Sequence, residues 1–219
     1  MIDLSQVSVA VFDCDGVILE SNQLKTEGFR AALPGEPSEQ VEEFVTFHKV
    51  NGGVSRYVKF EHYFREIKKL NGFEGELDQA LRRYSDFVRA ALLSCDEIPG
   101  IRATLESLKA RSVPCAVNSG GDEAELRELF QVRGLDEYFA EILGSPKTKI
   151  DNLEILKQQG YLQGPGVYFG DAKSDLTAAS EFGLDFVFVH GVSEWKDGVS
   201  YCSSREIPMI ASFADLQIN

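Results

Sequence analysis

Two acidic residues stand two positions apart, directly after an apolar run near the start of the chain. The run is Val7–Phe12, and Asp13 and Asp15 follow it with Cys14 between them. In an extended segment, side chains two residues apart point to the same side, so both carboxylates are expected on one side. Two like charges held this close require a cation or a proton between them. Oxygen ligands of this kind suit Mg²⁺, which leaves room for a substrate phosphate and water.

Two later segments carry groups that suit the same chemistry. Asp171 and Asp175 follow another apolar run and offer further carboxylate oxygens. Ser119 is followed by Gly120 and Gly121 at an expected strand-to-helix turn. Backbone N–H groups at such a turn are suited to receive an anion.

The spacing of apolar residues predicts the elements that position these groups. Short apolar runs that end in polar residues or glycine are typical of buried parallel strands, and they occur at 7–12, 113–117, 167–169, 186–189 and, more weakly, 208–211. Helical patterns alternate with them at 101–110, 122–132, 150–159 and 174–182. This alternation predicts an α/β protein with a parallel sheet flanked by helices. Ligands of such sheets bind beyond the carboxyl ends of the strands, where the polar groups named above lie.

The segment from about residue 20 to 95 interrupts this alternation. It has no strand-like run of comparable quality, and amphipathic patterns fill it at 24–33, 41–47, 57–70 and 77–93. We therefore predict two domains. Residues 1–18 and 96–219 form the α/β core, and residues 19–95 form an all-helical domain inserted after the first strand, where it can cover the crevice.

With these motifs in place, the chain resembles the haloacid dehalogenase superfamily of phosphohydrolases. The resemblance lies in the branch with a helical cap, which contains phosphoglycolate phosphatases and β-phosphoglucomutases. Four motifs occur in the family's order: Asp13-Cys14-Asp15-Gly16-Val17, Ser119, a lysine before a helix, and Gly170-Asp171 with Asp175. The resemblance covers essentially the whole chain and implies a Rossmann-like core with an inserted cap.

The resemblance also implies a catalytic mechanism. Asp13 is expected to attack phosphorus and form an aspartyl-phosphate. Asp15 is expected to protonate the leaving oxygen and then deprotonate the attacking water. The expected cofactor is Mg²⁺, held by Asp13, Asp171 and the backbone carbonyl of Asp15. Asp175 completes the expected metal site, more as an outer or water-mediated partner than as a direct ligand.

The groups expected to bind the transferring phosphoryl oxygens are Ser119, the Gly120 amide and a lysine. Two lysines compete for that place, because Lys147 and Lys149 both precede the helical pattern that starts at residue 150. Lys149 is preferred because it immediately precedes the helix. The alternative for the other lysine is a solvated loop position.

Specificity is expected to come from the cap, because the core motifs touch only phosphate and metal. Gly53-Val54-Ser55-Arg56 resembles the cap loop of β-phosphoglucomutases, in which the arginine contacts the phosphate that is not transferred. Gly53 and Arg56 are therefore candidate specificity residues. The alternative interpretation is a helix-capping turn in which Arg56 is paired at the solvent-exposed surface. Lys59, one helical turn after Arg56, is a candidate to bind the same anionic group. A surface position is the stronger expectation for Lys59. Lys25 stands where relatives often carry histidine, so it either reaches an anionic substrate or lies on a helix surface.

Composition excludes several classes of protein. The 219 residues include 22 Lys and Arg against 35 Asp and Glu, which gives a net charge of −13. So acidic a surface repels nucleic acid and anionic lipid, although local cations in a cleft can still bind a small anion. No apolar run approaches a membrane span, and the start of the chain lacks the features of a signal peptide. The four cysteines have no metal-site or disulfide spacing, so a reduced, cytoplasmic compartment is expected.

The sequence therefore predicts a Mg²⁺-dependent phosphatase that hydrolyses a small phosphorylated metabolite through an aspartyl-phosphate. One alternative is a phosphosugar mutase of the β-phosphoglucomutase type. A second alternative is a non-catalytic protein that binds a phosphorylated metabolite. A small-molecule partner and a monomer or small homo-oligomer are expected, without nucleic acid or membrane.

Overall fold

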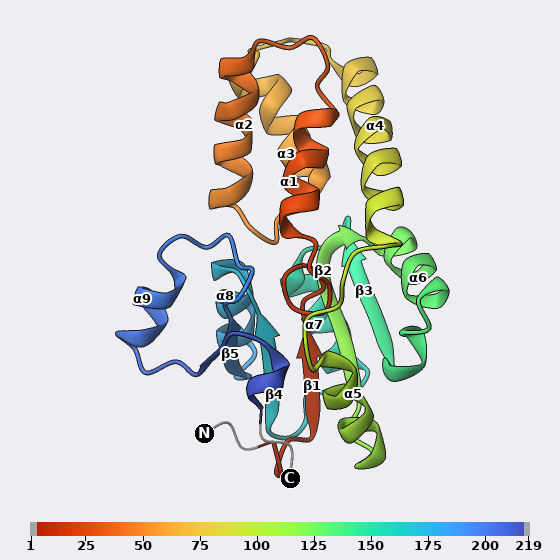
Figure 1. Ribbon diagram of the computed structural model, residues 1–219, viewed down its shortest axis with the longest axis vertical. Helices are drawn as coiled ribbons and strands as arrows, with labels where there is room; N and C mark the ends of the chain where they lie inside the picture. Colours follow the sequence, from red (N-terminus) through yellow and green to blue (C-terminus); the bar gives the residue numbers. More distant parts are fainter. Residues whose placement is uncertain (1–3, 217–219) are drawn as a thin grey trace.

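Figure 1 shows the computed structural model of the protein, which describes residues 4–216. A six-stranded sheet with the order β3-β2-β1-β4-β5-β6 forms its centre, and all neighbouring strands are parallel. The strands are β1 (Val9–Phe12), β2 (Cys115–Asp122), β3 (Glu141–Ser145), β4 (Gly166–Gly170), β5 (Asp185–Val189) and β6 (Met209–Ile210). The predicted α/β fold with a parallel sheet is confirmed.

Helices cover both faces of this sheet. They are α5 (Ile101–Ala110), α6 (Glu123–Val132), α7 (Lys149–Gln158), α8 (Lys173–Glu181) and α9 (Gly198–Ser203), with short 3₁₀ turns at Asp136–Tyr138 and Phe213–Asp215. On one face, α5 and α6 pack on alternate strand residues such as Phe12 and Val117. On the other face, α7 and α8 pack on the intervening residues such as Val11 and Ala116. The strands are thus buried from both sides, which explains their continuous apolar runs.

Strand β3 was not predicted from the apolar runs. This strand pairs only with β2 and lies at one edge of the sheet. It contains just two large apolar residues, Ile142 and Leu143. An edge strand has a neighbour on one side only, so a long apolar run is not required of it.

Strand β2 also continues further than predicted. Its pairing with β3 extends, across a shift of register, to Asp122 opposite Ser145. Gly120 and Gly121 are therefore part of the strand, and the turn into α6 comes after them. Asp122 caps α6 by accepting a hydrogen bond from the Glu125 amide at 3.0 Å.

The inserted segment forms a helical layer beyond the carboxyl ends of the strands (Figure 1). Its helices are α1 (Asn22–Ala31), α2 (Ser38–Val50), α3 (Arg56–His62) and α4 (Glu74–Leu92), and α3 runs into a π-helical turn at Tyr63–Ile67. The single helix expected over 57–70 is thus divided. Aromatic rings fill the space between these helices. The centre of the Phe29 ring lies 5.4 Å from that of Phe44, 5.3 Å from that of Phe60 and 4.4 Å from that of Tyr84.

No helix within residues 4–216 has both the length and the apolar character of a membrane span. Even α4, with 19 residues, carries charged side chains along its exposed face.

Candidate active site

Three carboxylates meet at the centre of the site, two from adjacent strand ends and one, Asp175, from the first turn of α8. Strands β1 and β4 pair in register, and the Asp13 amide donates to the Phe169 carbonyl at 2.9 Å. Asp13 therefore lies beside Asp171, which follows β4. Each of Asp13, Asp171 and Asp175 offers an oxygen, and these three oxygens lie within 4.8 Å of one another. The side chains predicted from separate motifs are thus brought together.

Burial and mutual repulsion make this cluster unfavourable without positive charge. Burial raises the pKa of Asp13 to about 7, and the nearby carboxylates of Asp175 and Asp15 add to the rise against the lowering effect of Lys149. The pKa of Asp171 is raised well above its usual value by burial and then by Asp13 and Asp175. A cation between the carboxylates would offset these costs.

Asp175 has a different part from the other two acids. Its Oδ1 accepts hydrogen bonds from Lys149 and, at 3.1 Å, from the Tyr168 hydroxyl. Its Oδ2 accepts from the amides of Asp171 and Ala172 at 3.2 and 3.0 Å. Both oxygens are thus engaged by protein donors, so Asp175 fixes the lysine and the loop after β4. This arrangement favours the outer position considered for Asp175 over direct ligation.

Asp13 and Asp171 are consequently the side chains best placed to hold a metal. Each has a carboxylate oxygen in the cluster, and oxygen ligands at the ends of strands suit Mg²⁺, which binds few protein groups and keeps several waters. The buried, mutually repelling donor set fits a divalent cation. The side chain of Asp15 is not part of this cluster.

The two candidate lysines have separate environments. Lys149 begins α7 and is buried, with Nζ 3.0 Å from Asp13 Oδ1 and in contact with Asp175. Although burial alone would lower its pKa, Asp13 and Asp175 raise the pKa of Lys149 well above the usual value. Lys147 instead forms a partly exposed pair with Glu123 at 2.9 Å. The geometry therefore favours Lys149 for the phosphoryl oxygens, as preferred from the sequence.

Replacing each lysine with methionine should separate these two roles. We expect Lys149→Met to lower kcat/KM by at least about 100-fold, because a cation aimed at developing charge is lost. It should also destabilise the fold by about 3 kcal/mol, because buried carboxylates lose their partner. Lys147→Met removes a surface pair and should change stability by less than about 0.5 kcal/mol. Steady-state kinetics and thermal unfolding measure both effects, and equal losses in the two variants would contradict the assignment.

Asp15 is paired with the first cap helix. Lys25 Nζ lies 2.5 Å from Asp15 Oδ2, and the Ser21 hydroxyl donates to Asp15 Oδ1 at 2.6 Å. Burial would raise the pKa of Asp15, but Lys25 and Ser21 outweigh it and hold this pKa below its usual value. Lys25 is therefore not a surface residue, and its charge is already paired with a carboxylate of the protein. This pairing keeps Asp15 ionised.

Asn22 is a further contact between cap and core. Its Nδ2 donates to Asp171 Oδ2 at 2.6 Å and to the Val192 carbonyl at 3.1 Å. Gly16, with φ of +74°, lies so close that a Cβ atom there would collide with both Asn22 and Asp171. Glycine at this position thus permits Asn22, from helix α1, to approach and orient the Asp171 carboxylate.

The second motif also lies at this edge of the sheet. Ser119 is fully buried, and its Oγ accepts from the Gly121 amide at 3.0 Å, whereas Gly120 and Gly121 line the cavity. A Cβ on Gly120 would collide with the Gly53 carbonyl. Gly53, with φ of +77°, likewise has Ser174 and Lys149 where a Cβ would be. The Gly53 loop thus packs directly on the core motifs, and glycine at both positions permits the approach.

Arg56 is engaged with the core. Its guanidinium forms two hydrogen bonds with Glu125, at 2.6 and 3.0 Å, and donates to Ser85 at 2.7 Å. It also lies 4.8 Å from the centre of the Tyr84 ring. Arg56 is buried and lines the cavity, so it is not the solvent-paired arginine of the alternative interpretation. Its charge is already paired by a bidentate carboxylate from α6.

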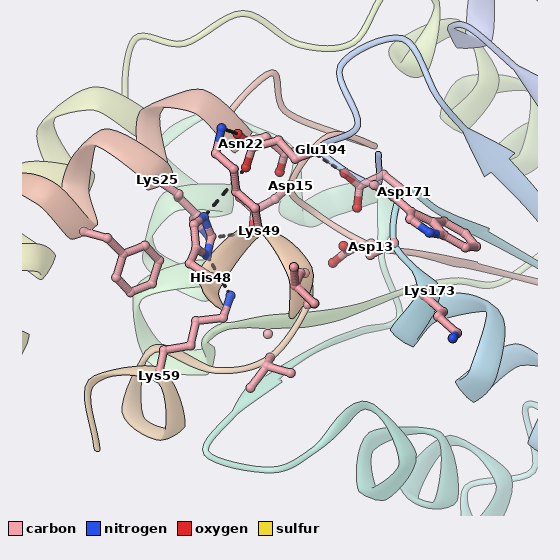
Figure 2. A pocket seen from close by; sticks show the side chains of 18 of the residues that line it. Asp13, Asp15, Asn22, Lys25, His48, Lys49, Lys59, Asp171, Lys173 and Glu194 are labelled. Atoms are coloured by element: carbon pink, nitrogen blue, oxygen red, sulfur yellow. Dashed lines mark hydrogen bonds and ion pairs between the residues drawn. The ribbon is translucent and has the colours of Figure 1, made fainter. Parts of the chain in front are cut away.

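A cavity of about 600 Å³ separates the cap from the carboxylate cluster. Figure 2 shows Asp13 and Asp171 on one side and Lys25, His48 and Lys59 on the other. The lining is richer in cations than the protein as a whole, with six cationic side chains (Lys25, Lys49, Arg56, Lys59, Lys173 and Lys196) against five acidic ones (Asp13, Asp15, Asp171, Glu194 and Asp197). The cavity is therefore suited to a small anionic ligand.

Two residues that line this cavity differ from the sequence-based expectation: Glu194 was not predicted, and Lys59 was predicted at the surface. Glu194, on the loop after β5, accepts a hydrogen bond from Thr26 at 2.9 Å and pairs with Lys49 at 3.0 Å. No local motif marks it, because its partners are cap residues distant in sequence. Lys59 was expected at the surface, but only 3% of it is exposed. Its helical spacing from Arg56 was the available signal.

Comparisons with known proteins agree with this site. A family model described as haloacid dehalogenase-like hydrolase matches residues 10–189. The chain belongs to this family and is a hydrolase, which confirms the predicted family and the prediction of an enzyme.

Individual relatives cover nearly the whole chain. A phosphorylated carbohydrates phosphatase of Thermotoga maritima is 24% identical over 203 residues, which cover 87% of this chain and 89% of that protein. Among solved structures, a predicted phosphoglycolate phosphatase from Haemophilus somnus has a TM-score of 0.75 and 21% identity, covering 97% of each chain. A β-phosphoglucomutase from Clostridium difficile has a TM-score of 0.70 and 16% identity, covering 96% of this chain and 93% of that one. The two structural likenesses support the fold.

Proposed function

We propose that this protein is a Mg²⁺-dependent phosphatase that hydrolyses a small phosphorylated metabolite, such as a phosphorylated carbohydrate, through an aspartyl-phosphate. The observation that carries the proposal is the meeting of Asp13 and Asp171, which line the cavity, with the buried Lys149 ammonium 3.0 Å behind Asp13 Oδ1. Two carboxylates and a lysine in this arrangement suit the transfer of a phosphoryl group to Asp13.

In the first step, an oxygen of Asp13 attacks phosphorus as the bond from phosphorus to the leaving oxygen breaks. The leaving oxygen takes the electron pair of that bond and a proton from Asp15, which carries it from the preceding turnover, and departs as an alcohol. Lys149, whose Nζ lies 3.0 Å from Asp13 Oδ1, would bind the transferring oxygens together with the Gly120 amide. When bound by Asp13 and Asp171, Mg²⁺ would neutralise negative charge around the phosphoryl group.

In the second step, water attacks the aspartyl-phosphate, and its proton passes to Asp15 as the bond between Asp13 and phosphorus breaks. Phosphate is released and Asp13 is regenerated. The ion pair with Lys25 keeps Asp15 ionised, so Asp15 is ready to accept that proton. In the next turnover Asp15 gives this proton to the leaving oxygen and is ionised again.

The helical segment over residues 19–95 would act as the cap domain that closes this site, on the core formed by 1–18 and 96–219. In support, several polar contacts join the two parts around the cavity. Arg56 pairs with Glu125, Lys49 pairs with Glu194, and the Ser174 hydroxyl donates to the Gly52 carbonyl at 2.8 Å. A closed cap excludes bulk water and macromolecules, which favours a small substrate.

A panel of phosphomonoesters incubated with the protein and Mg²⁺ tests this proposal. We expect inorganic phosphate to be released over many turnovers, with kcat/KM highest for small metabolite phosphates. Conversion of a sugar phosphate to its isomer without phosphate release would instead establish the mutase alternative. Tight binding of a phosphometabolite without either reaction, at every divalent metal tried, would establish the binding-protein alternative.

A further inference from the structure

Among residues 4–216, four lysine and arginine side chains are buried, and one of them differs from the others. Lys25 pairs with Asp15, Arg56 with Glu125, and Lys149 with both Asp13 and Asp175. Lys59 is equally buried, but no carboxylate within residues 4–216 lies at ion-pair distance from its Nζ. A buried charge without a counter-charge is costly, so its retention requires an explanation.

The contacts of Lys59 fix its position without neutralising it. Its Nζ lies 2.8 Å from His48 Nδ1 and 5.5 Å from the centre of the Phe29 ring. Burial, and then Lys59 itself, lower the pKa of His48 to about 2, so this imidazole is neutral. Its Nδ1 can accept from Lys59 while its Nε2–H donates to Thr26 Oγ1, 3.0 Å away. Thr26 in turn donates to Glu194, which completes a chain that holds the imidazole in one orientation.

The surrounding charges leave Lys59 electrostatically unsatisfied. Burial lowers the pKa of Lys59 to about 7, and repulsion from Lys25 adds to this effect. Asp15 and Glu194 act in the opposite direction but only partly compensate. An anion bound beside Nζ would supply the missing counter-charge. One N–H of the ammonium is directed at His48, so two further donors remain for that anion.

Lys59 also lines the cavity that contains the proposed nucleophile. Figure 2 shows its ammonium group on the cap side, with Asp13 on the opposite side. A substrate whose phosphate lies at Asp13 would therefore direct its leaving group towards the cap. Arg56, the residue expected from the sequence to read a second anion, is already paired with Glu125.

We propose that Lys59, oriented by His48, is a specificity-determining residue that binds a second anionic group, a carboxylate or a phosphate, on the leaving group of the substrate. The inference rests on the proposed phosphatase function and adds a substrate class to it. A charge-assisted hydrogen bond to a buried ammonium is strong enough to select such substrates over phosphate esters with a neutral leaving group.

Matched substrate pairs test this proposal. The carboxylate pair is 2-phosphoglycolate and 2-hydroxyethyl phosphate, which differ only in the charged group. The phosphate pair is propane-1,3-diol bisphosphate and its monophosphate. For each pair, selectivity is the ratio of kcat/KM for the ester whose leaving group is anionic to kcat/KM for the ester whose leaving group is neutral. We expect Lys59→Met to lower this ratio about tenfold or more in at least one pair.

The two pairs identify which anion the residue binds. A loss of selectivity in the carboxylate pair alone assigns a carboxylate, and a loss in the phosphate pair alone assigns a phosphate. Lys69→Met, a cap lysine with an exposed side chain, makes the same charge change away from the cavity and should keep the wild-type ratios. Equal losses for both members of each pair, or no selectivity in the wild type, would overturn the proposal.

A binding measurement keeps the inference separate from the proposed function. The shift in melting temperature produced by each ester is measured for the Mg²⁺-loaded Asp13→Asn protein, in which the proposed hydrolysis cannot proceed, and for the same protein that also carries Lys59→Met. We expect the esters with an anionic leaving group to stabilise the Asp13→Asn protein more than the esters with a neutral leaving group, and this difference to disappear when Lys59→Met is added. If the wild type releases no phosphate from any ester, the phosphatase proposal fails, and this difference alone then decides the role of Lys59. An unchanged difference in the variant would refute it.

Discussion

Replacing Asp13 with asparagine is expected to lower kcat for phosphomonoester hydrolysis by about 10⁴-fold or more. The proposed mechanism forms a covalent bond to Asp13, and an amide cannot take its place as nucleophile. The side chain lies 3.0 Å from Lys149 and within the carboxylate cluster, so no neighbouring group replaces it without moving the substrate. Phosphate release with Mg²⁺ present, compared with the wild type on the same ester, measures the effect.

The fold of this variant should be retained. Asparagine has nearly the same shape as aspartate, and burial raises the pKa of Asp13 to about 7, so loss of its charge removes repulsion from Asp175 and Asp15 and relieves Asp171. We therefore expect the metal-free variant to unfold at the same temperature as the metal-free wild type or higher. A folded variant that kept more than about 1% of wild-type kcat would contradict the covalent mechanism.

Removing divalent metal is expected to lower activity by about 10³-fold or more, and added Mg²⁺ should restore it. The physical reason is that a bound cation offsets several kcal/mol of charge repulsion at the phosphoryl group. Burial and neighbouring acids raise the pKa of both Asp13 and Asp171, so the site by itself is short of positive charge. Dialysis against a chelator, followed by titration with Mg²⁺, measures the loss and the recovery.

Thermal unfolding supplies a second measurement of the same site. A ligand that binds only the folded state raises the melting temperature, so Mg²⁺ should stabilise the wild type. Asp171→Asn should abolish this stabilisation. Asp185→Asn makes the same change at an exposed position where β5 begins, at the other end of the sheet, and should leave it intact. Full activity after chelation, or stabilisation by Mg²⁺ that survives in Asp171→Asn, would contradict the proposed metal site.

The positions of the core residues were predictable because local sequence and sheet topology suffice to bring them together. Asp13 and Asp171 each follow a buried apolar strand, and parallel strands end at the same edge. Lys149 was likewise predictable from its place at the start of a helix. The edge strand β3 was not, because a strand with one neighbour needs few apolar residues.

The partners of the cap residues were beyond the reach of local patterns. Lys25, Arg56 and Lys59 are cationic residues on amphipathic helices, and the sequence does not distinguish a helix face that meets solvent from one that meets another domain. The structure pairs the first with Asp15 and the second with Glu125, 69 positions away in the chain, and it buries the third beside His48.

The sequence by itself determined the family, the fold and the acidic groups at the strand ends, because each depends on short-range spacing and on the common direction of parallel strands. Only the tertiary structure decided which charges are neutralised. That outcome depends on distances between the inserted helices and the sheet, and a difference of a few ångströms decides whether a buried cation has a counter-charge within the protein.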